Sequence, residues 1–224
     1  MANYKVSGLI TGVSSLLQSN PRHHHPSDPI NKLMAPVQTK RKKTEEDHVA
    51  LARFGFITSG HWGTENLKDG IEVDSNGNVL FEGFSDPMIP ADMLKACIGE
   101  SSKALQNRMG SAFSRGVQIH NDMPLIYDGP KDCNGMWDAD LYRNDGGSRN
   151  GGSLVWITRV CIPKGWQLKF DLFCESSQVE VSVLEEMIIA AGKYIGMGSW
   201  RPANGGRFGR FTLDEFSAVE VPGL

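Results

Sequence analysis

The chain has 224 residues, of which 40% are hydrophobic and 22% are charged, and its formal net charge at pH 7 is −3. This composition is typical of a globular protein with a buried core, and it excludes a disordered or fibrous chain. No apolar run approaches the ~20 residues of a membrane-spanning helix, so we expect no membrane partner.

The first part of the chain predicts a strand, an irregular arm and a short helix. β-Branched and polar residues mix over 3–11, which indicates a strand that ends at Gly12. Residues 18–44 contain four prolines and end in a basic run at 40–43, so we expect a loop or mobile arm. Thr44 is a candidate N-cap, and three acidic residues after it predict a short helix to about residue 53.

The middle of the chain predicts further strands and one long helix. We expect strands at 53–59 and 79–84, separated by a turn region. Pro90 and the apolar residues after it, at helical spacing, predict a helix that runs through Leu105. Strand signals return at 115–127.

The last part of the chain predicts a loop, a hairpin and a second helix. Residues 129–152 hold six glycines and are interpreted as a long loop. Strict alternation predicts that 153–162 and 166–174 form a hairpin. Ser182 and Glu185 fit a capping box, and Gly192 marks the expected end of that helix. A last strand follows Phe211.

The order strand, helix, strand, strand, helix, strand predicts an α+β, ferredoxin-like (RRM-like) split βαβ core. We expect a single domain over residues 1–224, with a large insertion at 18–84 after the first strand. The four cysteines form no CxxC pair, so we expect no structural zinc and reduced thiols in a cytoplasmic protein.

The charge of the chain is segregated. The windows 29–44, 101–121 and 187–213 contain no Asp or Glu, and they hold twelve of the 23 Lys and Arg residues. The rest of the chain is therefore strongly acidic. If the windows converge on one face, they form the basic footprint that binds phosphates; if they scatter over the fold, they carry no function.

A second glycine cluster, at 192–209, lies inside the last of these windows. Glycines permit a positive φ and a close approach of backbone to a ligand, while arginines bind phosphate bidentately and aromatic rings stack on bases. This composition favours single-stranded nucleic acid, although Phe211 fits a core position better. The candidate contacts in this loop are Gly196, Gly198, Trp200, Arg201, Gly206, Arg207, Phe208, Gly209 and Arg210.

Three segments resemble the RAMP superfamily, the repeat-associated proteins of CRISPR effector complexes. Residues 206–210 (GRFGR) are similar to its C-terminal Arg-Gly-x-Gly-Arg loop. Residues 89–96 (IPADMLKA) are similar to the Ile-Pro-Gly-Ser-Ser-Leu-Lys-Gly that opens its first helix, with Ala91 and Asp92 in place of Gly-Ser. Residues 8–12 (GLITG) resemble its opening strand.

The resemblance implies a backbone subunit that polymerises along a guide RNA. It implies a non-enzymatic protein without a cofactor, which binds single-stranded RNA in a bacterial host or phage-infected cell. The protein then forms a helical or filamentous homo-oligomer and contacts other effector subunits. In such a protein the arm at 18–44 suits a thumb that folds over the RNA. Further basic candidates for RNA contact are then Lys40, Arg41, Lys42, Lys43, Lys95 and Lys103.

Three alternatives stay open. The first is a single-stranded DNA-binding protein of phage recombination. The second is a metal-dependent endoribonuclease that uses Asp28, because RNA-cutting members of the resembled family place an Asp in this loop; a surface turn between Pro26 and Pro29 is the competing interpretation. The third is a structural phage assembly protein. Three successive histidines at 23–25 cannot present their imidazoles to one ion from an extended strand, so no metal is assigned.

Overall fold

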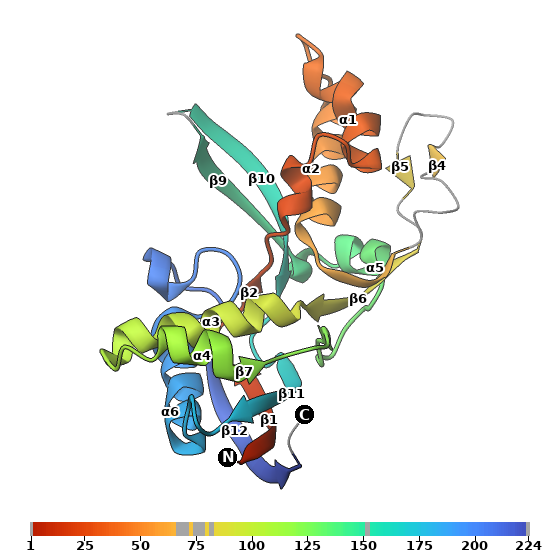
Figure 1. Cartoon of the computed structure of the whole chain (residues 1–224). Helices are drawn as coiled ribbons and strands as arrows, with labels where there is room; N and C mark the ends of the chain where they lie inside the picture. Colours follow the sequence, from red (N-terminus) through yellow and green to blue (C-terminus); the bar gives the residue numbers. More distant parts are fainter. Residues whose placement is uncertain (1, 66–71, 74–78, 81–82, 151–152, 223–224) are drawn as a thin grey trace. The chain divides into compact units, whose positions relative to one another are not determined.

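The computed structural model describes residues 2–65, 72–73, 79–80, 83–150 and 153–222 (Figure 1). The chain divides into two compact units. Unit 1 contains Met1–Leu16, Met88–Asp128 and Pro163–Leu224, and unit 2 contains Leu17–Pro87 and Gly129–Ile162. The predicted insertion at 18–84 falls in the first segment of unit 2. Among the described residues, no helix combines the length and the apolar character needed to cross a membrane.

Unit 1 is built on a four-stranded sheet in which every neighbouring pair is antiparallel. Its strand order is β12 (Phe211–Val221), β1 (Asn3–Gly12), β11 (Gln167–Glu175) and β7 (Val117–Gln118). A short strand, β8 (Met123–Pro124), pairs with residues 88–89 at the end of β6 (Phe84–Ile89). The long strands come from the two ends of the unit, so the first and last strands of the chain lie side by side.

The helices of unit 1 pack together. They are α3 (Ala91–Leu105), α4 (Gly110–Gly116) and α6 (Val181–Ala190), and α6 continues into the π-helical turn η3 (Ala191–Ile195). α3 contacts both α6 and η3. The predicted helix after Pro90 is confirmed. The capping box expected for α6 is wrong, because the helix begins at Val181 and its N-cap, Glu180, makes no side-chain cap bond.

The core of unit 1 follows from the period of two in its strands. Val6 on β1 stands opposite Leu172 on β11, Ile10 stands opposite Leu168, and all four are fully buried. Residues between them, such as Lys5 and Asp171, are exposed and form an ion pair of 3.4 Å on the other face of the sheet. The buried helix residues Leu94, Ile98, Leu184 and Ile188 complete this core.

Unit 2 combines helices with small antiparallel sheets. Its helical elements are η1 (Pro21–His24), α1 (Pro29–Thr39), α2 (Glu45–Ser59), α5 (Cys133–Asp138) and η2 (Asp140–Tyr142). One sheet has the order β2 (Leu16–Leu17), β10 (Ser153–Ile162) and β9 (Arg143–Asn150), and α2 packs on β10. In addition, β3 (Trp62–Glu65) pairs with β6 (Phe84–Ile89), and β4 (Glu72–Val73) pairs with β5 (Val79–Leu80). The predicted α+β class is confirmed at this level.

Two predicted elements of unit 2 are wrong. The segment 53–59 is the second half of α2, where Thr58 Oγ1 donates to the carbonyl of Phe54 and residues 54–59 are all buried. Burial on all sides gives this stretch the apolar, β-branched composition of a strand. The arm at 18–44 contains α1, which begins at Pro29 directly after its N-cap, Asp28.

The predicted hairpin is also wrong in its pairing. β10 pairs with β9, from Ser153 opposite Asn150 to Val160 opposite Arg143, whereas β11 pairs with β1 and β7. The first glycine cluster therefore contains a strand and two short helices instead of one long loop. Its composition hides the strand because glycine and Asp are rare in strands, while β10 supplies the apolar side chains of the pair.

Candidate nucleic-acid interface

The glycine-rich loop, residues 196–210, is held by its own backbone between η3 and β12. The Met197 N–H donates to the Gly209 carbonyl at 2.9 Å, and the Gly209 N–H donates to the Ser15 carbonyl at 2.8 Å. Four of its glycines, at 196, 198, 205 and 209, have a positive φ between 72° and 76°. The loop is therefore a fixed structure whose glycines are required by its geometry.

Close approach explains a further glycine. A Cβ atom on Gly206 would lie 1.8 Å from the Trp200 carbonyl oxygen, so no other residue fits there without a shift of the backbone. The same Trp200 carbonyl accepts the Phe208 N–H at 3.0 Å. These contacts hold Trp200 in the left-handed region, at φ +50°, with 51% of its surface exposed. A bulky residue in this region is uncommon and requires support from its surroundings.

Arg201 binds within the protein. Its Nη2 donates to Glu100 Oε2 on α3 at 2.9 Å, and its Nη1 donates to the Gly196 carbonyl at 3.5 Å. The buried Cys97 thiol donates to that same carbonyl at 3.2 Å, and burial raises the pKa of this thiol to about 12. Arg201 thus ties the loop to α3, and its charge is partly neutralised by Glu100.

The other two arginines of the loop are exposed. The Arg207 guanidinium lies over the Phe208 ring, 5.2 Å from its centroid. Arg210 Nη1 donates to the Lys193 carbonyl at 3.2 Å. Among the described residues, neither Arg207 nor Arg210 has an acidic partner within ion-pair distance. Their charges are available to a ligand.

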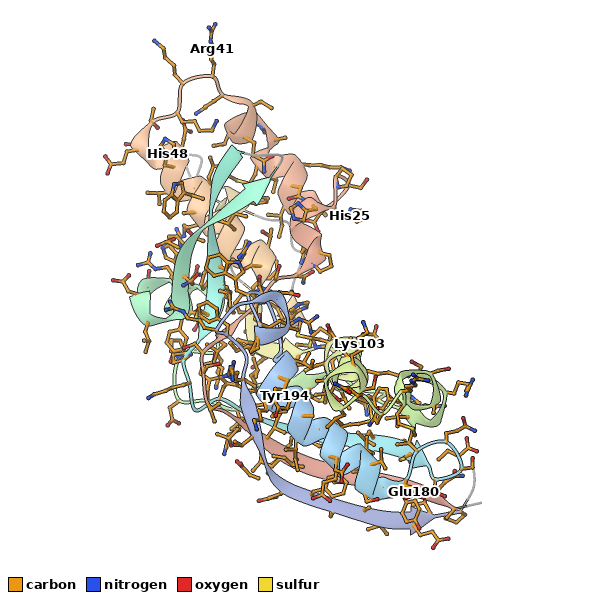
Figure 2. The ribbon with its side chains drawn as sticks, turned by 90° about the vertical axis from the view of Figure 1, so that its left-hand side faces the viewer. His25, Arg41, His48, Lys103, Glu180 and Tyr194 are labelled. Carbon is orange, nitrogen blue, oxygen red and sulfur yellow. The ribbon has the colours of Figure 1, made fainter. Side chains whose placement is uncertain are left out.

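Not every aromatic ring of the loop faces solvent. Phe208 is 6% exposed and Phe211 is 3% exposed, so both rings belong to the core of unit 1. We therefore leave Phe208 out of the proposed stacking surface. Exposed rings come instead from Trp200 and from Tyr194 in η3, which is 48% exposed and has the Lys193 ammonium 4.9 Å from its ring centroid. Figure 2 labels Tyr194 and Lys103 in this unit.

The two lysines predicted on the first long helix line one hollow. This hollow has a volume of about 440 Å³ and lies between α3 and α4. Its lining includes Lys95, Lys103 and Glu100, and Glu100 is the residue that holds Arg201. Within unit 1, Glu100 thus connects the hollow that the α3 lysines line to Arg201 of the glycine-rich loop.

The basic run 40–43 lies in unit 2, at the connection between α1 and α2 (Figure 2). Lys40 Nζ forms an ion pair of 2.6 Å with Asp47 Oδ1, and this hydrogen bond is the main cause that lowers the pKa of Asp47. Lys43 Nζ donates to the carbonyls of Gln38 and Lys40. Two of the four cations thus close the turn, and Arg41 and Lys42 are exposed at its tip.

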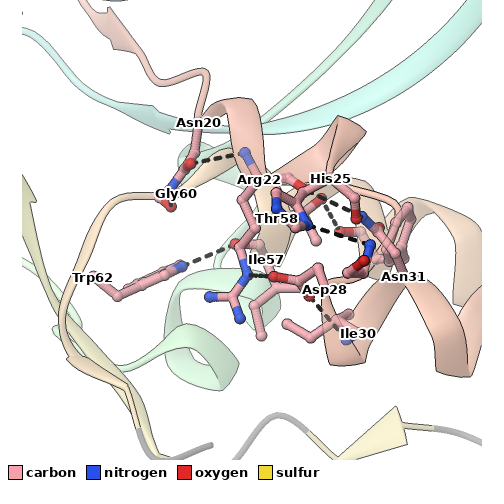
Figure 3. Close-up of polar contacts among 12 residues, drawn as sticks. Asn20, Arg22, His25, Asp28, Ile30, Asn31, Ile57, Thr58, Gly60 and Trp62 are labelled. Carbon is pink, nitrogen blue, oxygen red and sulfur yellow. Dashed lines mark hydrogen bonds and ion pairs between the residues drawn. The ribbon is translucent and has the colours of Figure 1, made fainter.

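Asp28 is engaged in the local structure of unit 2 (Figure 3). Its Oδ1 accepts the Ile30 N–H at 2.9 Å as the N-cap of α1, and its Oδ2 forms an ion pair of 2.6 Å with Arg22 Nε. Both side chains of the pair are nearly buried. Across the described part of the chain, no group of three or more His, Cys, Asp or Glu side chains is arranged to hold a metal ion. Asp28 therefore has a structural role.

Sequence reasoning missed three residues of this surface. Lys193 and Tyr194 stand just before the glycine pair, inside the acid-free window 187–213. Both are exposed in the π-helical turn η3, which no sequence pattern predicts. Glu100 lies outside every basic window. Its role appears only when the fold places α3 against the loop.

Comparisons with known proteins find similarity among solved structures alone. No protein-family model matches the sequence, and no curated protein matches it. Among solved structures, one similar chain belongs to a "Cryo-EM structure of the Type III-B Cmr-beta bound to cognate target RNA", with 12% sequence identity and a TM-score of 0.46. The match covers 98% of this chain and 61% of that chain, so this protein spans about three fifths of its neighbour's length.

Proposed function

We propose that the chain is a non-enzymatic RNA-binding subunit that oligomerises along single-stranded, guide-type RNA in a CRISPR-like ribonucleoprotein of the cytoplasm. The observation that carries the RNA-binding part is the glycine-rich loop. Hydrogen bonds fix its backbone, and Arg207 and Arg210 form no ion pair with an acidic side chain of the described residues. The oligomeric part follows the resemblance of residues 89–96 and 206–210 to the RAMP superfamily.

The proposal includes a ferredoxin-like core for unit 1. The strand order β12-β1-β11-β7, with antiparallel neighbours and with α3 and α6 after β1 and β11, supports it. In this arrangement the glycine-rich loop joins the second helix to the last strand. The other face of the sheet is less suited to RNA, since Asp171 and Glu215 offset Lys5 and Lys169 there.

The surface on unit 1 fits a nucleic-acid strand in its chemistry. Cations bind the phosphates, and the exposed rings of Trp200 and Tyr194 offer faces on which unpaired bases stack. This recognition depends little on sequence. The cations that we assign to the surface are Lys95, Lys103, Lys193, Arg207 and Arg210. If each cation contacts one phosphate, a plot of the logarithm of the RNA-binding constant against the logarithm of the salt concentration has a slope of about −3.5.

The test is fluorescence anisotropy of a labelled oligouridylate between 50 and 200 mM salt. We expect the double variant R207Q/R210Q to lower the affinity roughly tenfold at low salt and to reduce the slope by about 1.4. The matched control is K164Q/K169Q, which removes two exposed cations of the same unit outside the loop. An unchanged affinity in R207Q/R210Q, or an equal loss in the control, would show that the loop does not bind RNA. Competition with DNA of the same sequence distinguishes the two nucleic acids.

Assembly is tested separately. Size-exclusion chromatography with light scattering and absorbance at 260 and 280 nm reports mass and nucleic acid together. We expect a polydisperse, RNA-containing fraction for the wild type that shifts to smaller species after ribonuclease treatment. A large fraction without nucleic acid would favour a structural assembly protein instead.

A further inference from the structure

A small hollow in unit 2 surrounds Arg159 of β10. The hollow has a volume of about 30 Å³. It lies where β10 meets the start of the first segment of unit 2, since the Gln18 N–H donates to the Val160 carbonyl at 2.9 Å. Its lining residues are Ser19, Asn20, His24, Ser59, Ile157 and Arg159. Arg159 is thus a half-buried cation beside a run of polar side chains.

No acidic side chain of the described residues pairs with Arg159. Over the residues that the structure describes, its guanidinium has no hydrogen bond, ion pair or ring contact. The other arginines of the unit's interior differ in this respect: Arg22 pairs with Asp28, and Arg143 pairs with Asp140 and lies over the Trp137 ring. Burial alone lowers the pKa of Arg159, with no opposing anion, yet an arginine stays charged at neutral pH.

Partial loss of hydration makes an unpaired charge unfavourable, and an anion from outside the protein offsets that cost. The lining of the hollow suits an anion. Among the described residues that line it there is no carboxylate, and the polar groups besides Arg159 are the hydroxyls of Ser19 and Ser59, the Asn20 amide and the His24 imidazole. Ser59 already donates to the Phe56 carbonyl and Asn20 to the Gly60 carbonyl, so they shape the site. Among the described residues, the Arg159 guanidinium and the exposed Ser19 hydroxyl have no hydrogen-bond partner in the protein, so we assign them to a ligand.

We propose that this hollow is an anion site that takes a phosphate group, held by the guanidinium fork of Arg159 with Ser19 as a second donor. A planar guanidinium binds two phosphate oxygens at once, which a single ammonium does not. The phosphate has two possible sources, a phosphodiester of bound nucleic acid or free phosphate. The inference is independent of the glycine-rich loop, because Arg159 belongs to unit 2 and lies outside the acid-free windows of the sequence.

The experiment measures thermal unfolding in phosphate and in chloride at equal ionic strength. We expect inorganic phosphate to raise the Tm of the wild type by about 3 °C, as a ligand that binds only the folded state does. R159M keeps the length of the side chain but not its charge. We expect it to show no phosphate shift and to be at least as stable as the wild type in chloride, because it removes an unpaired charge. R159K, which keeps the charge without the fork, retains part of the shift.

Two controls make the outcome specific. R143M removes an arginine of the same sheet whose charge is already paired, so it keeps the phosphate shift whatever it does to stability. R207Q/R210Q also keeps the shift, which separates this site from the proposed RNA-binding loop. If R159M loses affinity for labelled oligouridylate in chloride, the phosphate belongs to nucleic acid; if only the phosphate shift is lost, the ligand is free phosphate. A full phosphate shift in R159M, or destabilisation of R159M in both buffers, would overturn the proposal.

Discussion

The glycine-rich loop offers a direct comparison between two of its glycines, Gly205 and Gly209. Both have nearly the same left-handed backbone, with φ of 73° and 72°. An added Cβ meets nothing within 4 Å at Gly205, whereas at Gly209 it would lie 1.8 Å from the Met197 carbonyl oxygen. Substitution by alanine therefore separates the backbone penalty, which both positions share, from the steric one, which only Gly209 has.

The expected magnitudes follow from these contacts. G205A costs about 1 kcal/mol, the penalty of a left-handed alanine. G209A adds the displacement of Met197 and weakens two backbone hydrogen bonds, from the Met197 N–H to Gly209 and from the Gly209 N–H to Ser15. At about 1 kcal/mol for each bond, the total is roughly 3 kcal/mol.

Urea unfolding followed by circular dichroism measures both variants, and anisotropy measures their RNA affinity. We expect G209A to lose both stability and RNA binding, and G205A to keep its affinity within twofold. Equal free energies of unfolding for the two variants would refute the reasoning, since the loop would then tolerate a side chain at its closest backbone contact. If G209A lost stability but kept its RNA affinity, RNA binding would not depend on the geometry of the loop.

Three further predictions concern single side chains. W200A lowers the affinity for oligouridylate roughly tenfold, because one stacked base contributes about 1–3 kcal/mol, while unfolding in urea changes little. E100Q frees the charge of Arg201 for phosphate, so the affinity measured by anisotropy rises about threefold although the free energy of unfolding falls by about 1 kcal/mol; an affinity that falls would contradict this role. The lowered pKa of Asp47 means that its contribution to stability is present above its unfolded pKa and is lost as pH falls through its folded pKa. D47N is therefore less stable than the wild type in urea at pH 6, and the difference narrows at pH 3; a constant difference would contradict the ion pair with Lys40.

The predictable parts of the fold are those with local signals. Pro90 and the helical spacing after it fix the start of α3, and Thr44 with Asp47 forms the capping box that begins α2. The segment 53–59 shows where such signals fail. It is buried on all sides, so its apolar residues do not recur with the period of an amphipathic helix. The pairing of β9 with β10 fails for a related reason, because the glycines and polar residues of β9 carry no strand signal and only the fold selects the partner of β10.

The backbone geometry of the glycine-rich loop was predictable from the sequence, but the contacts of its arginines were not. The glycine spacing indicates a loop that needs positive φ values, and the structure places such values at Gly196, Gly198, Gly205 and Gly209. Sequence reasoning gave the three arginines of the loop one role. The structure divides them, because Arg201 meets Glu100 across about a hundred residues of chain, and no local pattern encodes that contact.

Counting basic residues is thus a weaker guide to phosphate binding than asking which of them lack an internal acid. In the run 40–43, two of the four side chains close a turn, and in the loop Arg201 binds α3. Neutralising any of these would disturb the fold and lower RNA affinity indirectly. Among the arginines of the loop, the criterion of an unpaired charge keeps Arg207 and Arg210 and removes Arg201, and in unit 2 it adds Arg159, which no charge window includes. A variant at such a position changes ligand binding with little loss of stability, and that combination distinguishes a contact residue from a structural one.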